Sequence, residues 1–177
     1  AIEALSKVNT LIIDKTGTLT EGKPSLKEIK LLTDDVQPIQ VETWIASVEQ
    51  HSSHPIAKIL SRLVPDDQLL VAQDFEDVSG FGVKAKVDGQ SLYVGSQKLI
   101  ETMGLFHNDS LIQQLDQQRR EGNVISFIAN DQQVLAYMSI HDAIKHNAKA
   151  VIHQLLSDGV EVVMATGDHE QNASVVA

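Results

Sequence analysis

The chain has 177 residues, of which 14 are Lys or Arg and 24 are Asp or Glu, so its formal net charge is −10. This acidic balance excludes a broad nucleic-acid-binding surface, because such a surface needs clustered Lys and Arg. The sequence contains no cysteine, which excludes disulfides, thiolate metal sites and cysteine nucleophiles. Hydrophobic residues make up 42% of the chain, an ordinary share for a folded protein with a substantial core. No apolar run approaches the ~18 residues that cross a bilayer.

The N-terminal part carries a short apolar run, Val8 and residues 11–13, which stops at Asp14. A run of this kind predicts a strand buried on both faces, as in a parallel sheet. Gly17 in the following loop would let the chain turn tightly around a ligand.

The middle of the chain is typical of an antiparallel α+β unit. Runs rich in β-forming residues predict strands near residues 26–32, 69–78, 81–87, 91–95, 123–130 and 133–140. Asp88-Gly89 predicts a two-residue hairpin turn, and Asn130-Asp131 predicts another turn. Apolar residues at helical spacing predict helices over residues 41–50, 55–64 and 110–120.

The C-terminal part predicts a helix over residues 143–156, which ends at Asp158-Gly159, and then a buried strand over residues 160–164. We therefore predict an α/β fold in which a partial Rossmann-like parallel-sheet domain is interrupted by an inserted domain. The outer domain would comprise residues 1–22 and 141–177. The insert, residues 23–140, would be an α+β domain built on a six-stranded antiparallel sheet flanked by helices.

Asp14 is the first candidate functional residue. Ligands of open α/β sheets bind beyond the carboxyl ends of the strands, where Asp14 is predicted to lie. A carboxylate there can attack a phosphorus atom if N–H groups, a lysine and Mg²⁺ screen the charge. Taken alone, however, an Asp after a strand is more often a helix cap or a solvated turn residue.

Seven consecutive residues resemble the phosphorylation signature of P-type ATPases within the haloacid-dehalogenase-like superfamily: Asp14, Lys15, Thr16, Gly17, Thr18, Leu19 and Thr20. The resemblance implies that Asp14 becomes an aspartyl-phosphate and that Lys15 lies by the phosphate. It also implies that the carbonyl of Thr16 helps to hold Mg²⁺, with Asp14 as the other ligand.

Thr166-Gly167-Asp168 resembles the second phosphate-side motif of the same family, which would place Thr166 on the transferring phosphoryl group. Relatives that act as phosphatases usually carry a second Asp where Thr16 stands. A threonine cannot take up and release a proton near neutral pH, so the resemblance favours a long-lived phosphoenzyme over a phosphatase.

Four features of the middle segment resemble the nucleotide-binding domain of heavy-metal-transporting P-type ATPases: Glu49, His54-Pro55, Gly80-Phe81-Gly82-Val83 and Val94-Gly95-Ser96. The resemblance implies that Glu49 and nearby backbone recognise the adenine edge and that His54 packs against or orients the nucleotide. Gly80 and Gly82 would allow close approach to the phosphates or ribose. The alternatives are that His54 only caps a helix and that the two glycines form a β-bulge. Ser96 stands where relatives often have Asn, and it offers fewer hydrogen bonds.

The resemblance implies the ATP-binding and phosphorylation part of a heavy-metal cation-exporting pump, with copper as the first choice of ion and ATP and Mg²⁺ as cofactors. The segment would be a soluble, cytoplasmic part of an integral plasma- or inner-membrane protein and would not bind the transported ion. Its partners would be the membrane and actuator domains of the parent pump.

In the family, a Gly-Asp-Gly motif supplies a further Mg²⁺ carboxylate, and this string does not occur in the 177 residues. We therefore expect this chain to bind ATP but not to transport, and Asp14 to be phosphorylated poorly or not at all. An incomplete parallel sheet would leave an edge that permits self-association. The alternatives are a soluble phosphatase of the same superfamily and a non-catalytic nucleotide-binding module.

Overall fold

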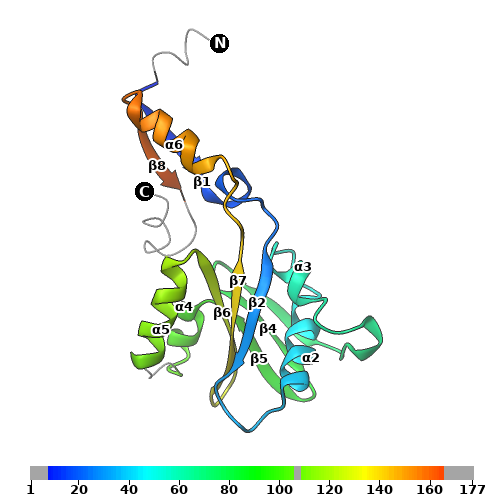
Figure 1. The fold of residues 1–177 in the computed structure, drawn as a ribbon. Coiled ribbons are helices and arrows are strands. Elements are labelled where there is room, and N and C mark those ends of the chain that lie inside the picture. Colours follow the sequence, from blue (N-terminus) through cyan, green and yellow to red (C-terminus); the bar gives the residue numbers. More distant parts are fainter. Residues whose placement is uncertain (1–7, 106–108, 166–177) are drawn as a thin grey trace.

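The computed structural model describes residues 8–105 and 109–165, which form two sheets joined by two crossings of the chain (Figure 1). The smaller sheet has two parallel strands, β1 (Thr10–Asp14) and β8 (Glu161–Ala165). Helix α6 (Ala148–Ser157) packs against it, and its Ala148 and Ile152 form a small core with Leu19. This unit confirms the predicted parallel pairing of the two ends of the chain.

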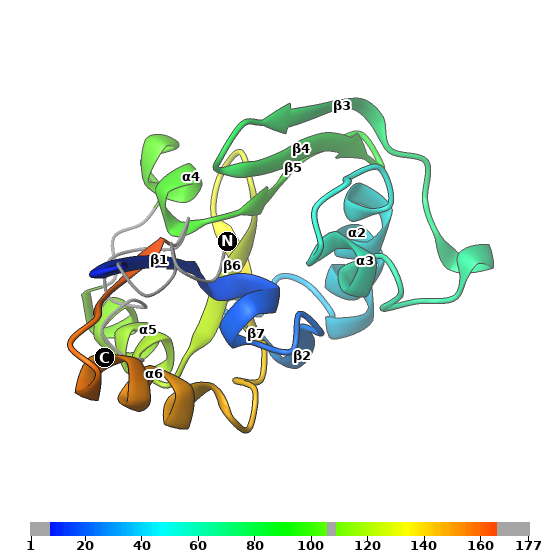
Figure 2. The same ribbon diagram turned by 90° about the horizontal axis from the view of Figure 1, so that it is seen from above.

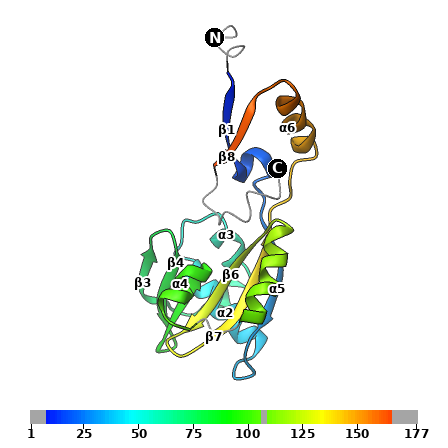
Figure 3. The ribbon, with the colours of Figure 1, turned by 90° about the vertical axis from the view of Figure 1, so that its left-hand side faces the viewer.

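The larger sheet has six antiparallel strands in the order β2-β7-β6-β5-β4-β3. Its strands are β2 (Ser25–Leu31), β3 (Gln73–Val78), β4 (Gly82–Val87), β5 (Gln90–Gly95), β6 (Asn123–Asn130) and β7 (Val134–His141). Its helices are α2 (Pro38–Glu49), α3 (Ala57–Leu60), α4 (Gln97–Thr102) and α5 (Asp109–Arg120). Figure 3 shows α4 and α5 on one face of this sheet, while α2 and α3 cover the other. The predicted six-stranded sheet flanked by helices is thereby confirmed.

Each face of the large sheet has its own hydrophobic core. The side toward α2 buries alternate residues of β4, which is the pattern that period-2 alternation dictates. That core includes Val41, Trp44, Ile45 and Val48 of α2 with Val83, Ala85 and Val87 of β4. The side toward α4 and α5 buries Ile100, Leu115, Ile125, Phe127 and Tyr137.

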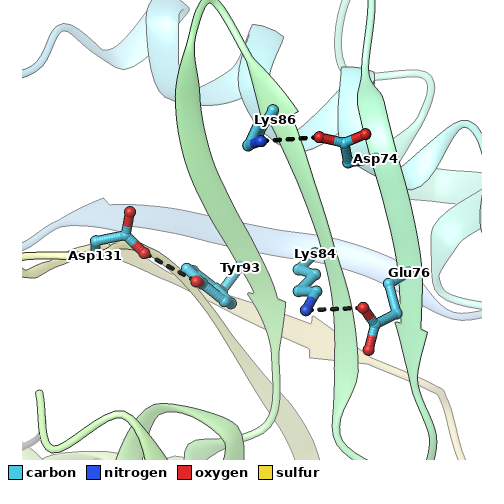
Figure 4. A network of polar contacts seen from close by, with 6 residues as sticks. All are labelled: Asp74, Glu76, Lys84, Lys86, Tyr93 and Asp131. Atoms are coloured by element: carbon cyan, nitrogen blue, oxygen red, sulfur yellow. Dashed lines mark hydrogen bonds and ion pairs between the residues drawn. The ribbon is translucent and has the colours of Figure 1, made fainter.

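On β3, β4 and β5, the face opposite α2 is polar and exposed. Three pairs of side chains lie on it (Figure 4): Lys84 with Glu76 at 2.8 Å, Lys86 with Asp74 at 2.9 Å, and Tyr93 with Asp131 at 2.8 Å. Strand β3 is the last strand of the sheet order, and its register shifts between Gln73 and Glu76. Charges and an irregular register both hinder pairing of an edge strand with another chain.

The prediction that the terminal strands are buried on both faces is wrong. Ile12 of β1 is 70% exposed and Val163 of β8 is 42% exposed. In the described ranges, α6 covers one face of this small sheet, and these two side chains lie on the other. Strand pairing was therefore predictable from the apolar runs, but the covering of each face was not.

Two predicted helices are shorter than expected. Around residues 55–64, only Ala57–Leu60 is α-helical, and the neighbouring turns use hydrogen bonds such as Ile59 N–H to Ile56 O and Arg62 N–H to Ile59 O. The helix expected from residue 143 begins at Ala148, because residues 143–145 pair instead with the chain that leaves β1.

Other local features depart from the expectations. Residues 69–72 are not part of a strand; a 3₁₀ turn, η2 (Asp66–Gln68), precedes them in a loop that projects beyond α3 (Figure 2). The short helix α4 and a π-helical turn, η1 (Lys15–Leu19), were not anticipated. In the part of the chain that the structure describes, no helix is long and apolar enough to span a membrane.

Candidate functional site

Asp14 is the last residue of β1, and the register pairs it with Ala165, the last residue of β8. The two parallel strands therefore end together. Thr166, Gly167 and Asp168 follow Ala165 in sequence and lie outside the described residues. Their predicted roles stay predictions, as do those of Asp14, Lys15 and Thr16.

The turn η1 carries the chain away from Asp14. Gly17 has a φ of 77°, a left-handed conformation that glycine adopts without steric cost. Its N–H donates to Thr20 Oγ1 at 3.0 Å, and its carbonyl accepts from Lys145 Nζ at 2.8 Å. The loop after Asp14 is therefore held by side chains as well as by its own backbone.

Glu49 ends α2 and is only 7% exposed. Burial and, second, the nearby charge of Asp77 together raise the pKa of this carboxyl from its ordinary 4.5 to about 7, against a hydrogen bond with Ser52 that lowers it. Glu49 can therefore be either protonated or charged near neutral pH. Asp77, on β3, is a neighbour that sequence reasoning missed.

His54 lies in the loop after α2 and is exposed. Its Nδ1 accepts the N–H of Ile56 at 3.2 Å, and its own N–H reaches Ser52 Oγ at 3.3 Å. With Nδ1 as acceptor, the neutral ring carries its proton on Nε2, so a ligand would meet an N–H donor there. This bond fixes the ring against the backbone just before α3, but it does not cap that helix, whose N-cap residue is Ile56 and which has no side-chain cap.

Gly82 and Gly95 are register partners on β4 and β5. A Cβ on Gly82 would overlap the carbonyl of Val94, and a Cβ on Gly95 would overlap that of Phe81. Gly80 has a φ of 79° in a turn that is closed by a bond from Phe81 N–H to Val78 O at 2.8 Å. The register of β3 and β4 is regular at Gly82, so the bulge alternative is wrong there; the glycine permits close backbone approach.

Ser96 follows β5 and joins it to the turn before β4. Its N–H donates to Phe81 O at 2.7 Å, whereas its Oγ is buried without a hydrogen-bond partner among the described residues. Lys98 Nζ lies 5.1 Å from the centre of the Phe81 ring, which fixes a positive charge beside this turn.

These contacts bring most of the predicted nucleotide residues to one end of the large sheet. Asp77, beside Glu49, pairs with Val83, the residue after Gly82, and Gly82 in turn pairs with Gly95. His54 follows Glu49 by five residues, but its hydrogen bonds stay within its own loop.

Residues 8–177 match the family model of the haloacid dehalogenase-like hydrolases. The chain belongs to this family. From the sequence we expected the reactive Asp at the carboxyl end of a parallel strand. Asp14 has that position, at the end of β1.

Similar proteins narrow the relationship within the haloacid dehalogenase-like hydrolases. The chain is 36% identical over 179 residues to a copper-exporting P-type ATPase of Legionella pneumophila, an alignment that covers 100% of this chain and 24% of the relative. A crystal structure of a zinc-transporting PIB-type ATPase in the E2.Pi state is 27% identical, with a TM-score of 0.62, over 100% of this chain and 28% of that one.

The catalytic domain of the CPx-ATPase CopB-B, studied for its conformational changes upon nucleotide binding, shares the fold with a TM-score of 0.69 at 24% identity. That match covers 99% of this chain and 59% of the solved one. The chain spans 24% of the length of the Legionella pneumophila relative, about a quarter. The resemblance of this haloacid dehalogenase-like hydrolase to heavy-metal P-type ATPases is confirmed.

The metal ligands of this family member stay a prediction. Among the described residues, no group of three or more His, Cys, Asp or Glu side chains could hold a metal ion. The oxygen donors implied by the resemblance, the Asp14 carboxylate and the Thr16 carbonyl, are of the type that Mg²⁺ prefers. Asp14 is the last residue of β1 and Thr16 comes two residues later, at the edge where the parallel strands end together.

Proposed function

We propose that this chain is the ATP-binding and phosphorylation segment of a heavy-metal cation-exporting P-type ATPase, with copper as the ion. The observation that carries the proposal is the position of Asp14, with its seven-residue signature, at the joint end of β1 and β8. The 36% identity to a copper-exporting P-type ATPase over the whole chain supports the choice of ion.

We assign phosphorylation to residues 1–22 and 141–177 and nucleotide binding to residues 23–140. The six-stranded sheet begins at Ser25 and ends at His141, close to these limits. The two crossings, near Lys23 and Asp142, would form the joint between the two domains.

In the proposed reaction, an oxygen of the Asp14 carboxylate attacks the γ-phosphorus of ATP. The new O–P bond forms as the bond from that phosphorus to the bridging oxygen breaks, and ADP leaves with the electron pair. Lys15 would offset the charge of the transferring group. Mg²⁺, held by Asp14 and the Thr16 carbonyl, would neutralise developing charge when bound.

The insert would bind the nucleotide. Glu49 would accept from the adenine amino group when charged or donate to a ring nitrogen when protonated, and His54 would offer its Nε2–H. Gly80 has open space where a side chain would lie, so a phosphate or ribose could approach its backbone, whereas at Gly82 the backbone of Val94 and Gly95 fills that space. Ser96 would add a buried hydroxyl close by.

Calorimetric titration of ATP into the whole chain and its variants tests the nucleotide site. We expect His54→Ala to weaken binding by about 1 kcal/mol, the value of one hydrogen bond. His153→Ala, an exposed histidine on α6, is the matched control and should bind like the wild type. Absence of ATP binding at millimolar concentration would overturn the nucleotide-binding part of the proposal.

Transfer of radiolabel from [γ-³²P]ATP, with Asp14→Asn as the control, tests the phosphorylation part. A label that hydroxylamine removes, and that Asp14→Asn abolishes without loss of ATP binding, is the expected result. Multiple turnover of a simple phosphate ester would instead support the phosphatase alternative.

A further inference from the structure

The loop after Asp14 is attached to the crossing that returns from β7 to α6. Thr20 Oγ1 donates to Asp142 Oδ2 at 2.6 Å, and the same oxygen accepts the N–H of Gly17 at 3.0 Å. Lys145 Nζ donates to the carbonyl of Gly17 at 2.8 Å. Both backbone polar groups of Gly17 are thus held from residues 142–145, one directly and the other through Thr20.

Asp142 also holds the other crossing. Its second oxygen, Oδ1, accepts the N–H of Lys23 at 3.2 Å. The two crossings pair through Thr20 and Ile144, and they run side by side between the two sheets (Figure 1). One carboxylate on the returning crossing therefore binds both the loop after Asp14 and the outgoing crossing.

The charge of Asp142 fixes the direction of these hydrogen bonds. A carboxylate only accepts, so the Thr20 hydroxyl must donate to it and use a lone pair for Gly17. Thr20 is 2% exposed, so water does not compete for this short, charge-assisted bond. An amide in place of Asp142 presents an NH2 group, which only donates, at one of the two positions where Oδ1 and Oδ2 now accept from Lys23 and Thr20.

We propose that Asp142 and Lys145 are positioning residues for the phosphorylation loop. They fix Gly17, and with it residues 15–19 after the acceptor Asp14, in one conformation. Because Asp142 lies on the crossing, a rotation of the insert would move the loop as well. The catalytic part of this inference rests on the proposed function of Asp14, whereas the control of loop conformation does not.

Backbone amide exchange of Gly17, measured by NMR in the whole chain, tests the conformational part. Asp142→Asn and Thr20→Val should speed this exchange about tenfold or more, as expected for loss of a charge-assisted hydrogen bond. Thr20→Ser keeps the hydroxyl and should restore slow exchange. Lys145→Met should likewise loosen the loop, and Lys145→Arg should restore it. Ser25→Ala removes a neighbouring hydroxyl that donates to His141 O, and it serves as the matched control.

Beryllium fluoride with Mg²⁺, a mimic of the phosphoryl group on Asp14, gives a second readout through its ¹⁹F resonance. We expect Asp142→Asn to weaken the capture of beryllium fluoride about tenfold. Thr20→Ser should recover the capture that Thr20→Val loses, and the affinity for ATP should stay the same in all variants.

Failure of the wild type to bind ATP or beryllium fluoride would overturn the proposed function, while Gly17 exchange would still decide the conformational claim. Unchanged Gly17 exchange in Asp142→Asn would overturn the inference, as would an equal acceleration throughout β1 and β8, which would indicate a purely structural role.

Discussion

Gly82 and Gly95 face each other across β4 and β5 so closely that neither has room for a side chain. A Cβ on Gly82 would lie 2.6 Å from the Cα of Gly95, and one on Gly95 would lie 2.7 Å from the Cα of Gly82. The contact joins the turn before β4 to Ser96 after β5. Gly82 and Gly95, one from each glycine-containing motif of the predicted nucleotide site, are therefore required by the structure even without a ligand.

We expect Gly82→Ala to destabilise the chain by about 2 kcal/mol or more, because backbone atoms cannot rotate away from the new methyl group. Gly80→Ala is the matched comparison, since a Cβ at Gly80 has nothing within 4 Å. It should cost only the left-handed conformation, about 1 kcal/mol. Urea unfolding measures both values, and equal losses for the two variants would contradict the steric argument.

Glu49 should make the stability of the chain depend on pH. Its pKa rises from 4.5 to about 7 on folding, so the folded state binds the proton more tightly than the unfolded state. The resulting stability is fully present below about pH 4.5 and is lost as the pH rises through about 7. Glu49→Gln should therefore be more stable than the wild type at pH 8, by an amount on the order of 3 kcal/mol.

The pH effect can be assigned by two further variants. Asp77→Asn removes the neighbouring negative charge that raises the pKa of Glu49. We therefore expect a lower pKa of Glu49 in this variant and a weaker dependence of stability on pH. Glu42→Gln, on the same helix, should leave the profile unchanged. Chemical denaturation between pH 4 and pH 8 measures each profile, and a flat difference between wild type and Glu49→Gln would refute the assignment.

The ion pairs of Figure 4 should contribute little to stability. The side chains of Lys84 and Glu76 are 40% and 59% exposed, so water and salt screen their attraction. A double-mutant cycle with Lys84→Met and Glu76→Gln should give a coupling free energy of less than about 1 kcal/mol. The same cycle in high salt should give a still smaller value, and a coupling above 2 kcal/mol would show that screening is weaker than the exposure implies.

Much of the fold was predictable because local patterns and tertiary structure agree. The alternation of apolar and polar residues along β4 matches its two environments, and Asp88-Gly89 forms the expected hairpin turn with φ values of 52° and 75°. The end of α6 was predictable for the same reason, since Asp158 caps it and Gly159 has a φ of 81°. Each of these features depends on a few neighbouring residues.

What the sequence did not reveal depends on residues that are far apart in the chain. Lys145 binds Gly17 across a separation of 128 residues, and Asp142 binds Thr20 across 122. The predicted early start of α6 was wrong because residues 143–145 have helical apolar spacing but pair with the other crossing. The candidate site was thus predictable as a motif around Asp14, whereas the contacts that hold the motif were not.

The exposed face of the small sheet should mediate self-association. Ile12 and Val163 are register partners on β1 and β8, and they are 70% and 42% exposed. Burying two such side chains against a second copy would recover part of the hydrophobic free energy, about 1.5–3 kcal/mol for each if fully buried. We expect sedimentation velocity to show association that increases with concentration.

The double variant Ile12→Thr with Val163→Thr tests this face. Threonine is also β-branched and suits a strand, so the variant should fold but shift toward monomer. Ile39→Thr replaces a side chain that is 57% exposed on α2 and should leave association unchanged. If the wild type stays monomeric at all concentrations, this face is not a self-association surface.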